Sequence, residues 1–157
     1  MLTKVVCAFP GTGKSYLAKK YPHLMLDYDS SRFSWITLSF GEKIRNPDFP
    51  ENYIQHIENM VSKQRYEIIF VSSHSEVREA LRRNNIPFTL VYPRLKDKSK
   101  YLLRYSKRGN TEEFISSVEK NWKSWILALQ SEIDGCENIE LKTDFIGDLY
   151  EIGRASC

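Results

Sequence analysis

Short runs of apolar residues alternate along the chain with longer stretches in which apolar residues recur every three or four positions. A short apolar run bounded by turn residues predicts a buried strand, whereas the longer spacing predicts an amphipathic helix. The runs that predict strands span residues 3–9, 23–29, 66–73, 88–93 and 138–142. The stretches that predict helices span residues 13–21, 51–64, 75–85, 111–133 and 144–153. Because strands and helices alternate, we expect an α/β fold with three layers and a mostly parallel sheet.

The longest predicted helix, 111–133, carries one apolar stripe that we expect to face the core. Its members are Phe114, Val118, Trp122, Trp125 and Leu129. Residues 32–50 contain a glycine and two prolines, which predict an irregular connection with one helical turn at most. Residues 154–157 read as a tail. Because the chain has no repeat, low-complexity segment or linker, we expect a single domain over residues 1–157.

The composition narrows the class of protein. The 157 residues are 41% hydrophobic and 27% charged, which is typical of a globular domain with its own core. The net charge of +3 suits a polyanionic ligand. No apolar run is long enough for a membrane span and no signal-peptide pattern is present, so we expect a cytoplasmic protein without a membrane partner. Three widely spaced cysteines without a CxxC pattern predict neither a disulfide framework nor a zinc site.

Residues 8–15 read AFPGTGKS and lie between the first predicted strand and the first predicted helix. The phosphate-binding pattern G-x-x-x-x-G-K-[ST] requires this context, and only its first position differs here, where alanine replaces glycine. Gly11 and Gly13 allow the backbone N–H groups to surround an anion, and the positive end of the following helix attracts phosphate. Lys14 would reach the β- and γ-phosphates of a nucleotide.

This loop predicts ATP and Mg²⁺ as cofactors. The residues expected to hold ATP are Pro10, Gly11, Thr12, Gly13, Lys14 and Ser15. The hydroxyl of Ser15 and the carboxylate of Asp27 are expected to hold Mg²⁺. The alternative is a glycine-rich turn that connects a strand to a helix and binds nothing.

Two acidic residues, Asp27 and Asp29, end the second predicted strand. Ligands of open α/β sheets bind beyond the carboxyl ends of the strands, and residues two apart in an extended chain face the same side. We therefore expect both carboxylates in one catalytic cleft, with Asp27 as general base and Asp29 beside the metal or the acceptor. In the alternative, one aspartate only caps the next helix, together with Ser30 or Ser31.

The third predicted strand, residues 66–73, is not followed by the aspartate that many phosphate-loop enzymes use to hold the metal. Ser72, Ser73 and His74 stand there instead, so the metal-side carboxylate is expected from Asp27 or Asp29. A serine at this place could hold a metal-bound water. We interpret His74 as a surface or capping residue rather than a base.

Residues 94–111 are strongly basic, with Lys96, Lys100, Arg104 and Arg108 at a spacing of four. On a helix these cations share one face, where their mutual repulsion is unfavourable unless an anion binds. We expect a helical lid in which Arg104 and Arg108 clamp the transferring phosphoryl group, because guanidinium groups match phosphate oxygens. The alternative is a solvated basic face.

Residues 34–53, together with Arg32 just before them, combine aromatic with basic side chains. They are Arg32, Trp35, Phe40, Lys43, Arg45, Phe49 and Tyr53. This mixture suits the binding of a nucleobase or nucleotide acceptor. It equally suits a flap with a small core of its own, and the sequence leaves both possibilities open.

The segments AFPGTGKS and LDYD and the arginine pair of the lid together resemble the small P-loop kinases, among them the nucleoside monophosphate, shikimate and gluconate kinases and the polynucleotide kinases. The segments NPDFPENYIQHI, IIFVSSHSEVREAL, LVYPRLKDKSKYLLRYSKRGN and FISSVEKNWKSWI are similar to a group of phage-encoded P-loop kinases that includes the 5-hydroxymethyluracil DNA kinases. The resemblance implies a core sheet of five parallel strands and, if the protein is viral, a place in the host cytoplasm.

For function, the resemblance implies a phosphotransferase that acts on the hydroxymethyl group of 5-hydroxymethyluracil in phage DNA, a DNA modification. The partner would then be a nucleotide or DNA acceptor. One alternative is a kinase of free nucleoside monophosphates. Another is a module that binds nucleotide and transfers nothing.

Overall fold

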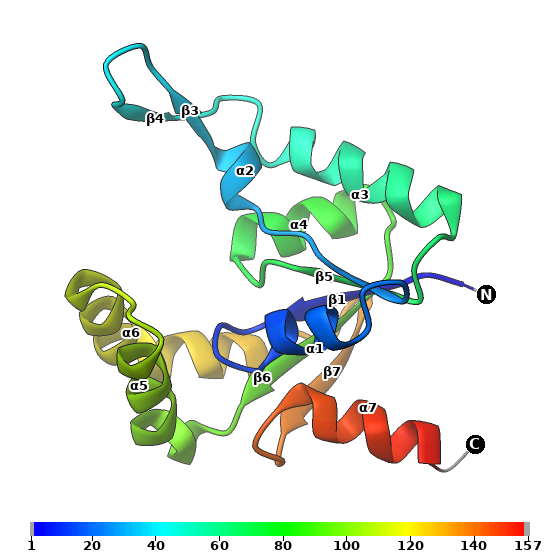
Figure 1. Cartoon of the computed structure of the whole chain (residues 1–157), viewed down its shortest axis with the longest axis vertical. Coiled ribbons are helices and arrows are strands. Elements are labelled where there is room, and N and C mark those ends of the chain that lie inside the picture. The colour runs from blue at the N-terminus through cyan, green and yellow to red at the C-terminus, as the bar shows by residue number, and fades with distance from the viewer. Residues whose placement is uncertain (1, 156–157) are drawn as a thin grey trace.

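The centre of the molecule is a sheet of five strands, all parallel (Figure 1). The structure, a computed structural model, describes residues 2–155, with side chains up to position 150. The strands are β1 (Lys4–Ala8), β2 (Met25–Asp27), β5 (Ile68–Val71), β6 (Phe88–Pro93) and β7 (Cys136–Leu141). Their order across the sheet is β2-β5-β1-β6-β7. The expected α/β fold with a five-stranded parallel sheet is therefore confirmed.

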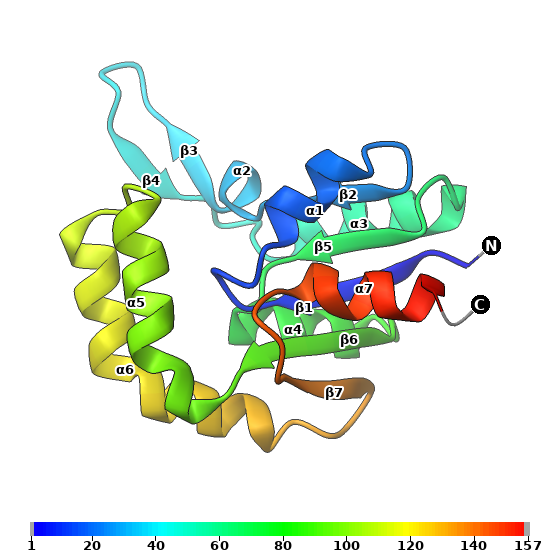
Figure 2. The same ribbon diagram turned by 60° about the horizontal axis from the view of Figure 1, so that its bottom comes forward.

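Helices flank this sheet on both faces, which gives the three expected layers (Figure 2). The helices are α1 (Lys14–Lys20), α2 (Ser31–Ser34), α3 (Glu51–Lys63), α4 (Ser75–Arg83), α5 (Lys98–Lys107), α6 (Glu112–Gln130) and α7 (Ile146–Ala155), with a 3₁₀ turn at Leu95–Asp97. Side chains of α1 and α7 pack on one face, and those of α3, α4, α5 and α6 belong to the core on the other.

The alternation of side chains along β1 shows how the sequence builds two cores. Val5 and Cys7 point into the core beneath α3, α4 and α6, whereas Val6 and Ala8 point toward α1 and α7. All four are buried, because a parallel sheet is covered on both faces. Burial raises the pKa of the Cys7 thiol, so this cysteine is a neutral packing residue.

Helix α6 follows its predicted stripe except at one position. Val118, Trp122 and Leu129 are buried, but Trp125 is 40% exposed and Ile126 takes its place in the core. The prediction that Trp125 faces the core was wrong. Positions 125 and 126 are about 100° apart and lie on opposite edges of the stripe, so the helical period allows either one, and the packing of this fold buries Ile126. The helix is capped by Thr111, whose hydroxyl accepts a hydrogen bond from the Phe114 N–H at 3.1 Å.

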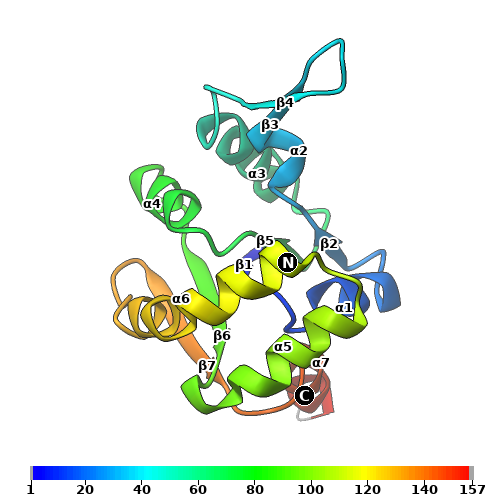
Figure 3. The same ribbon diagram turned by 90° about the vertical axis from the view of Figure 1, so that its left-hand side faces the viewer.

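The prediction of an irregular connection over residues 32–50 was only partly right. The single helical turn is α2, but it is followed by an antiparallel hairpin of β3 (Trp35–Thr37) and β4 (Lys43–Arg45). Figures 1 and 3 show this hairpin extending away from the central sheet, with which it shares no strand pairing. All residues from 35 to 45 are exposed, so the alternation of apolar and polar residues over positions 36–40 marks no buried face, and the glycine and prolines favoured irregular structure instead.

Near the C-terminus, β7 begins at Cys136, two residues before the predicted strand, and α7 continues to Ala155. The rest of the predicted tail, 156–157, lies outside the described residues. The two cysteines within the described range, Cys7 and Cys136, are both free, and Cys157 lies beyond that range. None of the helices between residues 2 and 155 combines the length and apolar character needed to cross a membrane.

Candidate active site

The glycine-rich loop links the end of β1 to the start of α1, as its sequence context predicts. Gly11 and Gly13 have φ angles of +87° and +90°, in the left-handed region that favours glycine. Between them, buried Thr12 donates a hydrogen bond from its hydroxyl to the Phe9 carbonyl at 2.8 Å. No side chain caps the first turn of α1, so its N–H groups are available to an anion.

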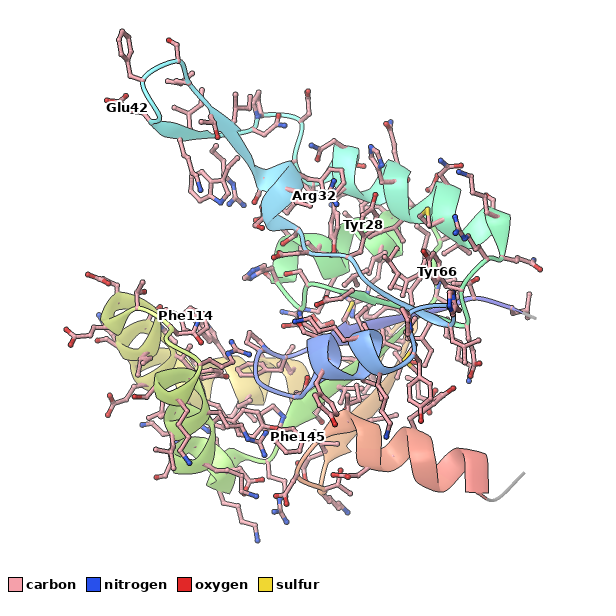
Figure 4. All side chains as sticks on the ribbon, in the orientation of Figure 1. Tyr28, Arg32, Glu42, Tyr66, Phe114 and Phe145 are labelled. Carbon is pink, nitrogen blue, oxygen red and sulfur yellow. The ribbon has the colours of Figure 1, made fainter. Side chains whose placement is uncertain are left out.

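Aromatic side chains from two other segments hold this loop in place. The Tyr105 hydroxyl, from α5, donates to the Pro10 carbonyl at 2.7 Å. On the other side the Ile146 N–H donates to the Thr12 carbonyl at 2.8 Å, and Phe145 packs against Gly13 (Figure 4). The side of the basic helix that carries Tyr105 is thus buried against the loop. The contact from Phe145 was not foreseen, because it depends on where the segment after β7 returns.

The absence of a side chain at Gly11 is required by this packing. A Cβ atom built there would lie 2.9 Å from the Tyr105 ring, a separation that real Cβ atoms do not tolerate. We expect Gly11→Ala to lower the free energy of unfolding by about 2–4 kcal/mol, from left-handed strain and ring displacement together. Gly41→Ala is the matched control, since its φ is +82° but nothing lies within 4 Å, and it should cost only about 1–2 kcal/mol. Equal losses in urea denaturation would contradict the packing contribution.

A cavity of about 620 Å³ opens beyond the carboxyl ends of β1, β2 and β5. It is lined by Pro10, Lys14, Ser15, Asp27, Asp29, Ser30, Ser72, His74, Arg108, Gly109, Asn110 and Phe114. Within it the Ser15 hydroxyl donates a hydrogen bond to Asp27 Oδ2 at 2.5 Å. The first turn of α1 and the end of β2 are therefore joined by the two side chains predicted to share a metal.

Most of the predicted site residues come together in this cavity, which we call the phosphate cavity. Lys14, Ser15, Asp27, Asp29 and Arg108 all line it. Gly11, Thr12 and Gly13 form the loop but are not among the lining residues, and neither is Arg104. Sequence reasoning missed Asn110 and Phe114 as lining residues. Gly109 was the signal that could have identified them. A glycine between two predicted helices indicates a turn, and this turn places the start of α6 beside the basic helix and therefore beside the cavity.

Asp29 lines the cavity and also holds the backbone at the start of α2, whose N-cap residue, Ser30, makes no side-chain cap of its own. Its Oδ1 atom accepts a hydrogen bond from the Ser31 N–H at 2.9 Å, at the start of α2. Asp29→Ala should lower the free energy of unfolding by about 0.5–2 kcal/mol, whereas Asp29→Asn should keep the cap and the stability. Thermal unfolding of both variants checks this, and equal destabilisation would contradict a capping role. A loss of turnover in the asparagine variant would then report the missing charge alone.

The two arginines of the basic segment, Arg104 within α5 and Arg108 directly after its last residue, act in different ways. Arg108 lines the cavity, where its Nε donates to Asn110 Oδ1 at 2.9 Å. Arg104 instead donates to two backbone carbonyls, of Gly11 at 2.8 Å and of Asp144 at 2.6 Å. Its guanidinium also lies 4.0 Å from the centroid of the Phe145 ring. In this arrangement Arg104 joins the glycine-rich loop to the segment before α7.

The polar residues after β5 also reach the cavity. Ser72 and His74 are both lining residues, and His74 precedes α4 without capping it through its side chain. His74 is exposed to solvent, yet the protein atoms near the imidazole lower its pKa, because they remove part of the water from the charged form. The ring is therefore neutral at pH 7.

The oxygen atoms of Ser15 and Asp27 fit Mg²⁺. A hydroxyl and a carboxylate are hard oxygen ligands, and Mg²⁺ commonly takes only one or two protein ligands beside waters and substrate phosphates. Within residues 2–155, no group of three or more His, Cys, Asp or Glu side chains could hold a metal by itself. A metal at this place would accordingly depend on phosphate oxygens for the rest of its coordination.

The aromatic and basic residues of the proposed acceptor segment divide into two groups. Tyr53 is fully buried in α3, and its hydroxyl accepts a hydrogen bond from the Ser72 N–H at 3.3 Å. Tyr53 therefore holds the backbone of a residue that lines the cavity. Trp35 and Phe40 are exposed on the hairpin. Arg45 of β4 is paired with Glu76 at the start of α4, which ties the hairpin to the body of the protein.

Comparison of the chain with models of protein families and with curated protein sequences finds no match in either. The fold and the side chains of the phosphate cavity are therefore the basis for assigning a function.

Proposed function

We propose that this protein is an ATP-dependent kinase that transfers the γ-phosphoryl group of ATP to a hydroxyl of a nucleobase or nucleotide. The observation that carries the proposal is the contact of Ser15 with Asp27 inside a cavity that also presents Lys14 and Arg108. Two cations, two carboxylates and an uncapped helix start at one sheet edge form the set of groups that phosphoryl transfer requires. We also propose a P-loop kinase fold, supported by the strand order and the glycine-rich loop after β1.

Each side chain has a role in this proposal. The loop and Lys14 would bind the triphosphate, and Ser15 and Asp27 would hold Mg²⁺, which would neutralise phosphate charge. A carboxylate oxygen of Asp27 accepts the proton of the acceptor hydroxyl. The acceptor oxygen then forms a bond to the γ-phosphorus, the bond from that phosphorus to its bridging oxygen breaks, and ADP leaves with the electron pair. Arg108 stabilises the charge of the transferring group, and Arg104 positions the loop.

For the acceptor, we propose 5-hydroxymethyluracil within DNA, which rests on the resemblance in sequence. Free nucleoside monophosphates are the second candidate. The phosphate cavity does not discriminate between these two acceptors. Its lining residues would contact the phosphates of ATP and the acceptor hydroxyl, but not the rest of the acceptor. A nucleotide-binding module without transfer is the third candidate. It could hold Mg²⁺ through the same Ser15 and Asp27 side chains, so only a transfer experiment separates it from a kinase.

The experiment that tests the function is transfer of label from γ-³²P-ATP in the presence of Mg²⁺. The panel of acceptors comprises DNA containing 5-hydroxymethyluracil, ordinary DNA and each free nucleoside monophosphate. We expect label to be incorporated into the hydroxymethyluracil DNA only. Label in the monophosphates would favour the second candidate, and no transfer to any acceptor, despite ATP binding, would favour the binding module.

A further inference from the structure

A second cavity, of about 550 Å³, adjoins the phosphate cavity. The two share three lining residues, Pro10, His74 and Phe114, so they lie next to each other. The second cavity lies between the start of α4 and the inner side of α6, and Trp125 and Ala128 form part of its wall. Figure 4 shows Phe114, one of the shared residues, at the beginning of α6. We call this space the side cavity.

The side cavity differs from the phosphate cavity in charge. Its two ionised side chains are both paired, Glu76 with Arg45 and Arg78 with Glu132. Arg78 is only 8% exposed and also donates from Nε to the Ser73 carbonyl at 2.9 Å. A charged ligand group would find no uncompensated partner here, and burying it would be unfavourable. The part of a ligand that enters this space is therefore uncharged.

The apolar part of the wall is aromatic where it is accessible. Trp125 is 40% exposed although it is large and apolar, and Phe114 is half-buried at the junction of the cavities. The indole and phenyl faces present flat surfaces on which a planar ring can stack. A volume of this size lies in the range that holds small organic ligands. The volume of the side cavity and its aromatic wall together favour a ligand with a planar ring.

We propose that the side cavity binds the uncharged, planar heterocyclic ring of the phosphoryl acceptor, with Trp125 as its stacking partner, while the acceptor's hydroxyl group lies in the phosphate cavity near Asp27. This inference rests on the proposed function, because it takes the ligand to be the acceptor. His74, neutral and shared by both cavities, lies between the two parts of such a ligand and can hydrogen-bond a polar edge of the ring.

The test uses two opposite substitutions in α6. Trp125→Ala removes the stacking face, and Ala128→Phe fills the space without removing any group. The probes are the free nucleosides thymidine and 5-hydroxymethyl-2′-deoxyuridine, which carry an uncharged ring and no phosphate, titrated by calorimetry. We expect each variant to raise the Kd of the nucleosides at least about tenfold, with the affinity for ATP unchanged. In the transfer assay, both variants should raise the KM of the acceptor and leave the KM of ATP unchanged.

Controls come from the neighbouring position on the same helix. Leu127 is exposed and does not line the side cavity, so Leu127→Ala and Leu127→Phe should bind nucleosides as the unaltered protein does. Circular dichroism shows whether each variant is folded. If Trp125→Ala does not fold, Ala128→Phe still tests the proposal.

The outcomes separate this inference from the proposed function. Nucleoside binding that depends on Trp125, without phosphoryl transfer to any acceptor, would overturn the kinase assignment and keep the ring site. Transfer with an acceptor KM unchanged in both α6 variants would overturn the ring site and keep the kinase. Failure of the unaltered protein to bind either nucleoside would also overturn the ring site.

Discussion

Replacing Lys14 with alanine should lower kcat for phosphoryl transfer by about 10²–10³-fold or more, with the fold intact. Lys14 is the first residue of α1 and lines the phosphate cavity, beside the turn formed by Gly11 and Gly13. Its ammonium group would contact the phosphoryl oxygens as their charge shifts during transfer, and the loss of one such donor removes several kcal/mol of transition-state stabilisation. Steady-state kinetics with labelled ATP measures the effect.

The control for this variant lies one and a half turns further along the same helix. Lys19 is exposed and outside the cavity, so Lys19→Ala should leave kcat unchanged while removing the same charge from the protein. Thermal unfolding of both variants should match that of the unaltered protein, because neither ammonium group is buried. Turnover retained in Lys14→Ala would count against the assignment of the glycine-rich loop as the ATP site.

The second large effect is expected for Asp27→Asn, which should lower kcat by about 10²–10⁴-fold and change ATP affinity only a few-fold. The asparagine side chain keeps the size of the residue and can still accept a hydrogen bond from Ser15. It lacks the charge that would hold Mg²⁺ and the basicity that would accept the proton of the acceptor. The transition state therefore loses stabilisation that bound ATP does not.

Two measurements together check this prediction. Single-turnover transfer gives the rate of the chemical step, and equilibrium binding of a nonhydrolysable ATP analogue gives the affinity. Asp48→Asn is a suitable control, since Asp48 is exposed and lies outside the phosphate cavity. Equal losses of rate and affinity in Asp27→Asn would assign Asp27 to binding alone.

The core of the fold could be predicted from the sequence because its strands carry continuous apolar runs. Residues 88–93 were expected as a strand and form β6 with the same bounds. The hairpin could not be predicted in this way, since neither face of β3 or β4 is buried and each strand has three residues. Trp125 was misplaced because positions 125 and 126 lie on opposite edges of the apolar stripe, so the helical period alone does not decide which of them is buried.

The candidate site was predictable where it depends on local chemistry. The glycine-rich loop and the two aspartates each lie within one short segment, and the rule on strand ends brought them to the same edge. Arg104 was harder to place. Its position among spaced cations suggested a phosphate ligand, but its contacts with the carbonyls of Gly11 and Asp144 depend on long-range packing. The pairing of Glu76 with Arg45, which neutralises the side cavity, is also a contact between distant segments.

The hairpin of β3 and β4 has a consequence for how this chain tolerates changes in length. A backbone hydrogen bond of 2.9 Å from the Asn46 N–H to the Ser34 carbonyl closes its base, so the chain leaves and rejoins the body at nearly the same point. Because its strands pair only with each other, insertions or deletions at its tip do not disturb the register of the central sheet. Evolution, or a protein engineer, can lengthen, shorten or exchange this arm independently of the central sheet.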